Sequence, residues 1–116
     1  MKTLLSLLVL LALSGSSFAD EIQKGAIVQV KPNSIWFQDA GKFNHWRQLK
    51  KSGNAAAFAS YQEKMLVERD AWQFTNTLTA KILSYEPAKD RVKVQMKTEG
   101  RILDTTWFLE PDALAR

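Results

Sequence analysis

The residues of this chain that could do chemistry gather in one basic and aromatic segment, positions 36 to 51. Tryptophan and arginine dominate the energetics of protein–protein contacts, and lysines add charge that an anionic partner would meet. The segment therefore predicts a partner-binding surface, with candidate contacts at Trp36, Phe37, Lys42, His45, Trp46, Arg47, Lys50 and Lys51. The other interpretation is a loop whose rings pack under a sheet while its charges face water.

The chain offers few residues for nucleophilic catalysis, which needs a base beside an activated hydroxyl. It holds one histidine, His45, and none of Ser52, Ser60 and Ser84 lies in a Gly-x-Ser-x-Gly frame. The acidic residues near positions 63 to 70 alternate with lysine and arginine, as on a solvated helix face. We therefore expect a protein that is not an enzyme, with a small hydrolase as the third of the functions considered.

Residues that could hold a metal ion or a cofactor are fewer still. With no cysteine and a single histidine, a zinc site would have to be built from carboxylates and water. No Asp-x-Asp-x-Asp-Gly calcium loop occurs, and the five glycines stand singly instead of forming a phosphate-binding loop. We expect neither a metal nor a cofactor.

The amino terminus has the three parts of a secretory signal peptide. Lys2 gives a positive start, positions 4 to 13 form an apolar core, and Ser17-Phe18-Ala19 places small residues before a cleavage site. The apolar run is shorter than the roughly 20 residues that span a bilayer. We predict that residues 1–19 are a signal peptide cleaved between Ala19 and Asp20, and that the mature protein is periplasmic or secreted.

Removal of 19 residues leaves 97, positions 20–116, which is enough for one small globular domain. Its formal charge, +4 for the whole chain and +3 without Lys2, is too small to indicate a nucleic-acid partner. No apolar run after position 19 is long enough to predict a transmembrane anchor. Because cysteine is absent, disulfides are excluded, and the domain must be held together by its apolar core and its sheet.

Period-two alternation and turn residues predict four strands. The run from Gly25 to Lys31 alternates and ends at a Pro-Asn-Ser turn, and a second alternating run covers 77–82. Positions 91–97 alternate most cleanly, and 102–109 form the last strand after a tight turn at Glu99-Gly100. The last three strands have short connections, which predicts an antiparallel meander.

One amphipathic helix is predicted over about 55–70. Asn54 is placed to cap it by accepting a hydrogen bond from a free amide of the first turn, and Phe58, Tyr61 and Met65 form its apolar stripe. Positions 42–51 allow only a short helix or a turn. The segment at 55–70 is thus the one helix on which the predicted fold depends.

These elements predict an α+β fold, mainly β: a small antiparallel curled sheet or an SH3-like barrel of four or five strands. The helix at about 55–70 would be inserted between strand 1 and a carboxyl-terminal three-stranded meander. The segments 80–85, 91–96 and 106–109, the last followed by a proline turn, resemble the closing strands of an SH3-like small barrel. The resemblance implies a fold and carries no function of its own.

Together these features predict an exported, non-catalytic binding protein that acts by protein–protein contact in the periplasm, of the inhibitor or immunity type. Its partner would be another extracytoplasmic protein, and nucleic acid is not expected. The alternative is an SH3-like module that binds the cell envelope, with peptidoglycan or another cell-wall glycan as its ligand. No oligomeric state is predicted.

Overall fold

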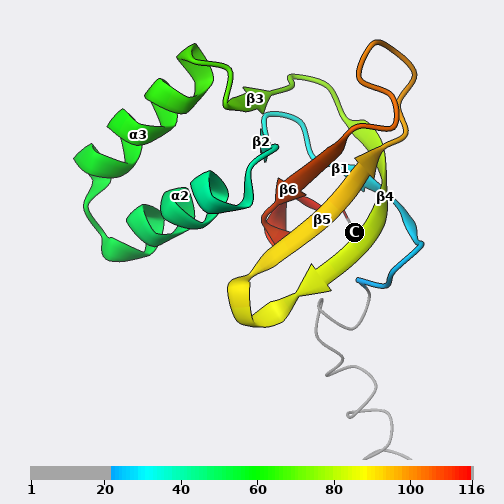
Figure 1. Ribbon diagram of the computed structural model, residues 1–116, viewed down its shortest axis with the longest axis horizontal. Helices are drawn as coiled ribbons and strands as arrows, with labels where there is room; N and C mark the ends of the chain where they lie inside the picture. Colours follow the sequence, from blue (N-terminus) through cyan, green and yellow to red (C-terminus); the bar gives the residue numbers. More distant parts are fainter. Residues whose placement is uncertain (1–21, 116) are drawn as a thin grey trace, which may run out of the picture.

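The framework of residues 22–115, the part of the chain that the computed structural model describes, is an antiparallel sheet of six strands (Figure 1). The predicted signal peptide lies outside the described residues. The strands are β1 (Ile27–Val30), β2 (Ile35–Phe37), β3 (Ala71–Gln73), β4 (Leu78–Glu86), β5 (Arg91–Met96) and β6 (Thr106–Leu109). Their order in space is β1-β4-β5-β6-β2-β3, which makes β1 and β3 the two ends of the sheet.

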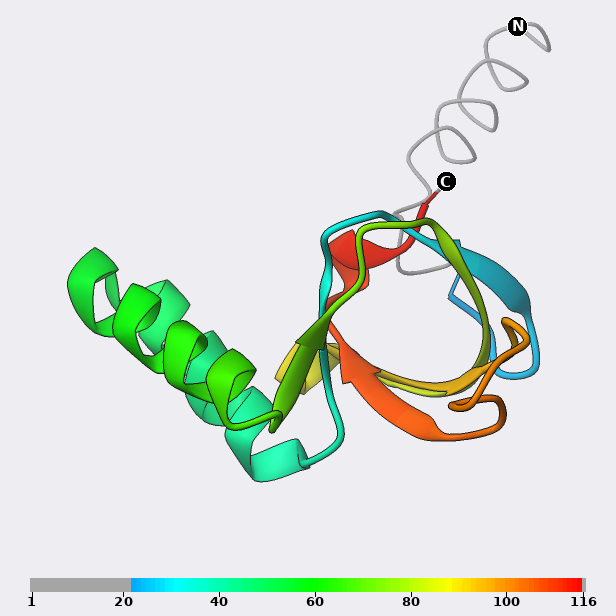
Figure 2. The ribbon, with the colours of Figure 1, turned by 90° about the horizontal axis from the view of Figure 1, so that it is seen from above.

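The sheet curls strongly (Figure 2). The predicted meander is confirmed, because β4, β5 and β6 are consecutive neighbours. A register shift between Ile82 and Ser84 marks a bulge in β4, and a bulge bends a strand and increases its twist. The sheet is not closed into a barrel, because β2 and β3 continue it beyond β6. The predicted curled sheet is therefore confirmed, whereas the closed barrel and the count of four or five strands are wrong.

Two short 3-10 turns shape the carboxyl-terminal half of the domain. The turn η2 (Pro87–Lys89) joins β4 to β5, and the next residue, Asp90, adopts a left-handed conformation with φ 50°. The turn η3 (Pro111–Ala113) follows β6 and brings Leu114 beside Val30 of β1. The last strand begins at Thr106 instead of position 102, because the connection after β5 is longer than the predicted tight turn.

Two helices, not one, stand between β1 and the meander. The helix α2 (Ala40–Ser52) begins after Asp39, whose Oδ2 accepts a hydrogen bond from the Lys42 amide at 2.8 Å, and ends at Gly53 with φ 79°. The helix α3 (Ala55–Val67) is capped by Asn54, as predicted. The helix predicted at 55–70 is confirmed as far as position 67. The prediction of a single inserted helix is wrong, because the segment that was expected to form at most a short helix or a turn at 42–51 is the second helix, α2, of 13 residues.

Two apolar clusters within the described residues lie on opposite sides of β2 and β6. The inner core fills the curled sheet and includes Val30, Trp36, Ile82, Val92, Val94, Met96, Trp107 and Leu109. The hairpin core joins the antiparallel helix pair α2–α3 to the sheet and consists of Ile35, Phe37, Phe43, Trp46, Met65 and Ala71. Successive residues of β2 enter opposite cores, so all three are buried.

Candidate functional site

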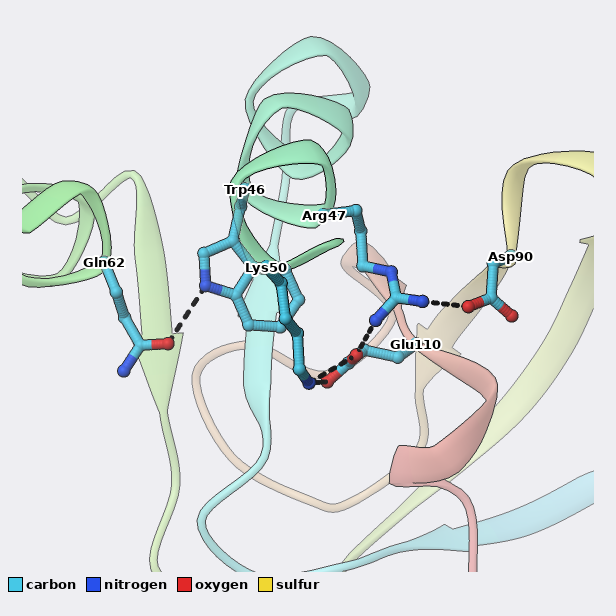
Figure 3. Close-up of polar contacts among 6 residues, drawn as sticks. All are labelled: Trp46, Arg47, Lys50, Gln62, Asp90 and Glu110. Carbon is cyan, nitrogen blue, oxygen red and sulfur yellow. Dashed lines mark hydrogen bonds and ion pairs between the residues drawn. The ribbon is translucent and has the colours of Figure 1, made fainter. Parts of the chain in front are cut away.

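The aromatic residues predicted to contact a partner lie inside the protein. Trp36 is 1% exposed in the inner core, and Phe37 and Trp46 are 0% and 2% exposed in the hairpin core. The Trp46 Nε1 donates a hydrogen bond to Gln62 Oε1 of α3 at 3.0 Å (Figure 3). Because large rings stabilise a core by the area that they bury, these three residues support the surface and form no part of it.

Two cations of the same segment are held by carboxylates that lie just outside the strands of the meander. Arg47 pairs with Asp90, just after η2, and with Glu110, between β6 and η3 (Figure 3). Lys50 Nζ lies 2.9 Å from an oxygen of the same Glu110 and 5.3 Å from the centroid of the Trp46 ring. These contacts fasten α2 to the turns at one end of the meander.

The other three predicted residues differ in their surroundings. Lys42 Nζ lies 2.9 Å from Asp70 Oδ1, and this hydrogen bond raises the pKa of Lys42. The exposed His45 ring meets Tyr61 edge-on, with ring centroids 4.6 Å apart, and burial raises the pKa of the Tyr61 hydroxyl. Lys51 is exposed and has no carboxylate partner within residues 22–115. The predicted segment therefore consists of the end of β2 and nearly all of α2, its tryptophan and phenylalanine rings are buried in the two cores, and most of its cations face carboxylates.

Of the four tryptophans of the chain, the exposed one, Trp72, lies outside the predicted 36–51 segment. Trp72, at the middle of β3, is 37% exposed and stacks on Phe74 with ring centroids 6.2 Å apart. The Arg69 guanidinium lies over the Trp72 ring, 5.8 Å from its centroid. Arg69 adopts a left-handed conformation with φ 62°, which is costly for a residue with a long side chain, and it lies where the chain passes from α3 to β3. We call Arg69, Trp72 and Phe74 the edge cluster.

The edge cluster lies at the open end of the sheet. At the other end, β1 is covered by the carboxyl-terminal segment: Lys31 N donates to Ala113 O, and Ala115 N donates to Gln29 O, both at 2.8 Å. β3 pairs with β2 on one side, and no strand within residues 22–115 pairs with its other side. A shallow hollow of about 390 Å³ lies beside this edge, lined by Leu66, Arg69, Ala71, Trp72 and Gln73.

Several acidic residues of the described part of the chain are engaged by cations. In residues 22–115 no three His, Asp or Glu side chains are placed together so as to hold a metal ion. The carboxylate of Glu86 accepts a hydrogen bond from Arg91 Nη2 at 2.7 Å, and this bond lowers the pKa of Glu86.

Within residues 22–115 no helix combines the length and the apolar character needed to cross a membrane.

Comparisons of the chain with protein-family models, with curated proteins and with solved structures found no match. The function must therefore be inferred from the residues of this chain and their geometry.

Proposed function

We propose that the protein is an exported, non-catalytic binding protein that acts by contact with another extracytoplasmic protein, as an inhibitor or immunity-type protein does. The signal-peptide pattern of residues 1–19 supports export. The observation that carries the binding proposal is the open edge of β3, with the exposed Trp72 beside Arg69. The contact surface that we propose is therefore the β3 end of the sheet, in place of the 36–51 segment.

An open strand edge suits recognition of a protein segment. The unpaired N–H and C=O groups of such an edge can accept an added strand from another chain, while neighbouring side chains select the partner. The lining of the hollow beside Trp72 includes the apolar residues Leu66 and Ala71. It could therefore receive one apolar side chain of a partner strand paired with β3.

The side chains of the edge cluster are of the types that dominate such contacts. Tryptophan and arginine are enriched among the few residues that supply most of the energy of an interface. Arg69 forms no ion pair within residues 22–115, so its charge is free for an acidic group of the partner. Stacking on Phe74 holds the Trp72 ring in place before a partner arrives, which lowers the entropy cost of binding.

A photoreactive amino acid at Gln73, which is exposed on β3, tests this surface directly. In a periplasmic extract we expect one dominant cross-linked protein, which mass spectrometry would identify. Its affinity for the purified chain should fall roughly thirtyfold in Trp72→Ala, because a hot-spot residue contributes at least about 2 kcal/mol.

The matched control is Ile27→Ala. Ile27 is 61% exposed on β1, at the opposite end of the sheet, so its truncation also removes exposed apolar surface. This variant should bind the partner as the unaltered chain does. Equal losses in the two variants, or no loss in Trp72→Ala, would contradict a contact at β3.

Envelope glycan is the second candidate ligand, and one observation favours it. A tryptophan ring that is 37% exposed beside a guanidinium and the amide of Gln73 is suited to a sugar, whose C–H groups pack against the exposed part of the ring while its hydroxyls bond to the polar groups. A glycan-binding protein would sediment with purified cell-wall sacculi and be released by soluble fragments. Sedimentation that is lost in Trp72→Ala but kept in Ile27→Ala would decide for the glycan.

We also propose that the sheet is an open relative of the SH3-like arrangement. The support is the order of its longer strands: β4, β5 and β6 follow one another, and the η3 turn then returns the chain to β1 through the bridge between Leu114 and Val30. On this proposal β2, the helix pair and β3 are an elaboration of the connection between β1 and β4. The function proposed above does not depend on it.

A further inference from the structure

A second hollow, of about 270 Å³, lies between α2 and the η2 turn. It is lined by Asn44, Arg47, Gln48, Lys51, Ala88 and Lys89. The four residues from α2 are spaced at three, four and seven positions from the first, so they share one face of the helix. None of the lining residues belongs to the edge cluster, so this hollow is independent of the function proposed for β3.

The charged residues that line this hollow are all cations. Lys51 and Lys89 are exposed and come from α2 and η2, respectively. Lys89 is only loosely paired, with its Nζ 3.8 Å from a Glu86 oxygen. Two lysines thus reach the same hollow from different elements, each with its charge largely uncompensated.

The carboxylates of this region are already engaged. Asp90 and Glu110 hold Arg47, Glu110 also holds Lys50, and Glu86 accepts hydrogen bonds from Arg91. The cations that line the hollow and the groups linked to them through ion pairs are Arg47, Lys50, Lys51, Lys89 and Arg91 on the positive side and Glu86, Asp90 and Glu110 on the negative side. Five cations against three carboxylates leave an excess of two positive charges.

Hydrogen-bond donors are also in excess. Asn44 Oδ1 accepts a bond from Arg91 Nη1 at 3.1 Å, which leaves the side-chain NH₂ of Asn44 as an unused donor among the described residues. Gln48 contributes a second amide to the lining. Arg47 Nε also lacks an acceptor within residues 22–115, but this atom is buried, so the unused donors that a ligand in the hollow can reach are those of the side-chain amides and the lysines.

We propose that this hollow binds a phosphate group. A phosphate monoester carries about −1.5 to −2 charges at pH 7 and offers three acceptor oxygens, which matches both the charge excess and the surplus of donors. A single carboxylate would balance only half of that excess. The volume exceeds that of one phosphate and leaves room for the group to which the phosphate is attached.

Titration of the ¹⁵N-labelled full chain with inorganic phosphate at low ionic strength tests the proposal. We expect saturable shifts of the side-chain amide signals of Asn44 and Gln48. The double variant Lys51→Gln, Lys89→Gln should bind phosphate about tenfold more weakly, at roughly threefold per exposed charge. The control, Lys31→Gln with Lys64→Gln, removes the same net charge from exposed positions outside the lining and should weaken binding less than about twofold.

A second arm of the experiment separates the sources of phosphate. Vesicles of phosphatidylcholine that contain phosphatidic acid, whose headgroup is a phosphate monoester, are compared with phosphatidylcholine alone and show whether the group belongs to a lipid. Binding to the anionic vesicles that is lost in the Lys51, Lys89 double variant assigns a lipid headgroup, whereas binding of free phosphate alone assigns a soluble phosphate ester. Equal weakening by the two double variants, or shifts that avoid Asn44 and Gln48, would overturn the proposal.

Discussion

Replacing Trp46 by alanine tests whether this residue stabilises the hairpin core or serves mainly to contact a partner. Its ring centroid lies 5.2 Å from that of Phe37, 5.9 Å from that of Phe43 and 5.6 Å from that of Phe58. Truncating a buried large aromatic costs about 3–5 kcal/mol, and a domain of this size has about 5–15 kcal/mol in all. We therefore expect Trp46→Ala to remove a large share of the free energy of unfolding.

Urea titration followed by far-ultraviolet circular dichroism measures this loss. With an m-value of about 2 kcal/mol/M, a cost of 4 kcal/mol lowers the midpoint by about 2 M. Trp46→Phe should lose much less, about 1 kcal/mol, because it keeps an apolar ring and gives up mainly the hydrogen bond to Gln62.

The matched control is Trp72→Ala, which removes the same side chain from a position that is 37% exposed. Its midpoint should fall by less than half as much as that of Trp46→Ala. Equal shifts in the two variants would refute the assignment of Trp46 to the hairpin core, and the 36–51 segment would return as a contact surface.

Three further perturbations test the cap, the ion-pair network and the pH dependence. Asn54→Ala should cost about 1 kcal/mol of unfolding free energy and Asn54→Gly only a few tenths, so equal losses would contradict the cap. Glu110→Gln should cost about 2 kcal/mol by chemical denaturation, because its partner Arg47 is largely buried, and a loss below about 0.5 kcal/mol would match an exposed pair instead. The Arg91 hydrogen bond lowers the pKa of Glu86 from 4.5, so the stability that it adds is fully present above about pH 4.5 and fades as pH falls through the folded-state pKa. The difference in thermal midpoint between the unaltered chain and Glu86→Gln should shrink over that range, and a constant difference would count against the pair.

The elements that the sequence predicted correctly are those set by local patterns. The helix at 55–67 follows from its cap and from the spacing of Phe58, Tyr61 and Met65, all three of which belong to or pack against the hairpin core. The alternation of β5 reflects a strand with one face in the inner core: Val92, Val94 and Met96 are buried, and the residues between them are half exposed.

The elements that the sequence missed depend on contacts between distant segments. The helix α2 buries only Phe43 and Trp46 among its residues, a stripe too narrow to predict a helix of this length, and ion pairs from Arg47 and Lys50 to the sheet complete its attachment. The strand β2 shows no alternation because both of its faces are covered.

The difference between the buried and the exposed tryptophans shows that residue type alone does not distinguish a core ring from a surface ring. Trp36 and Trp72 are directly paired across β2 and β3, yet Trp36 is buried and Trp72 is not. Both residues take part in the same pair, so the difference in their exposure comes from the order of the strands. β6 lies on the far side of β2, whereas the far side of β3 is open within the described residues. No pattern within either segment carries that information.

The shortness of the open edge also determines how a partner would bind. Three residues in β3 offer few backbone hydrogen bonds, and a short edge strand is one way in which proteins avoid unwanted pairing of sheets. A partner strand would therefore gain too little from backbone pairing alone to bind tightly. Most of the affinity must then come from Trp72 and Arg69, which is why loss of the Trp72 side chain should weaken binding roughly thirtyfold although the strand edge itself remains intact.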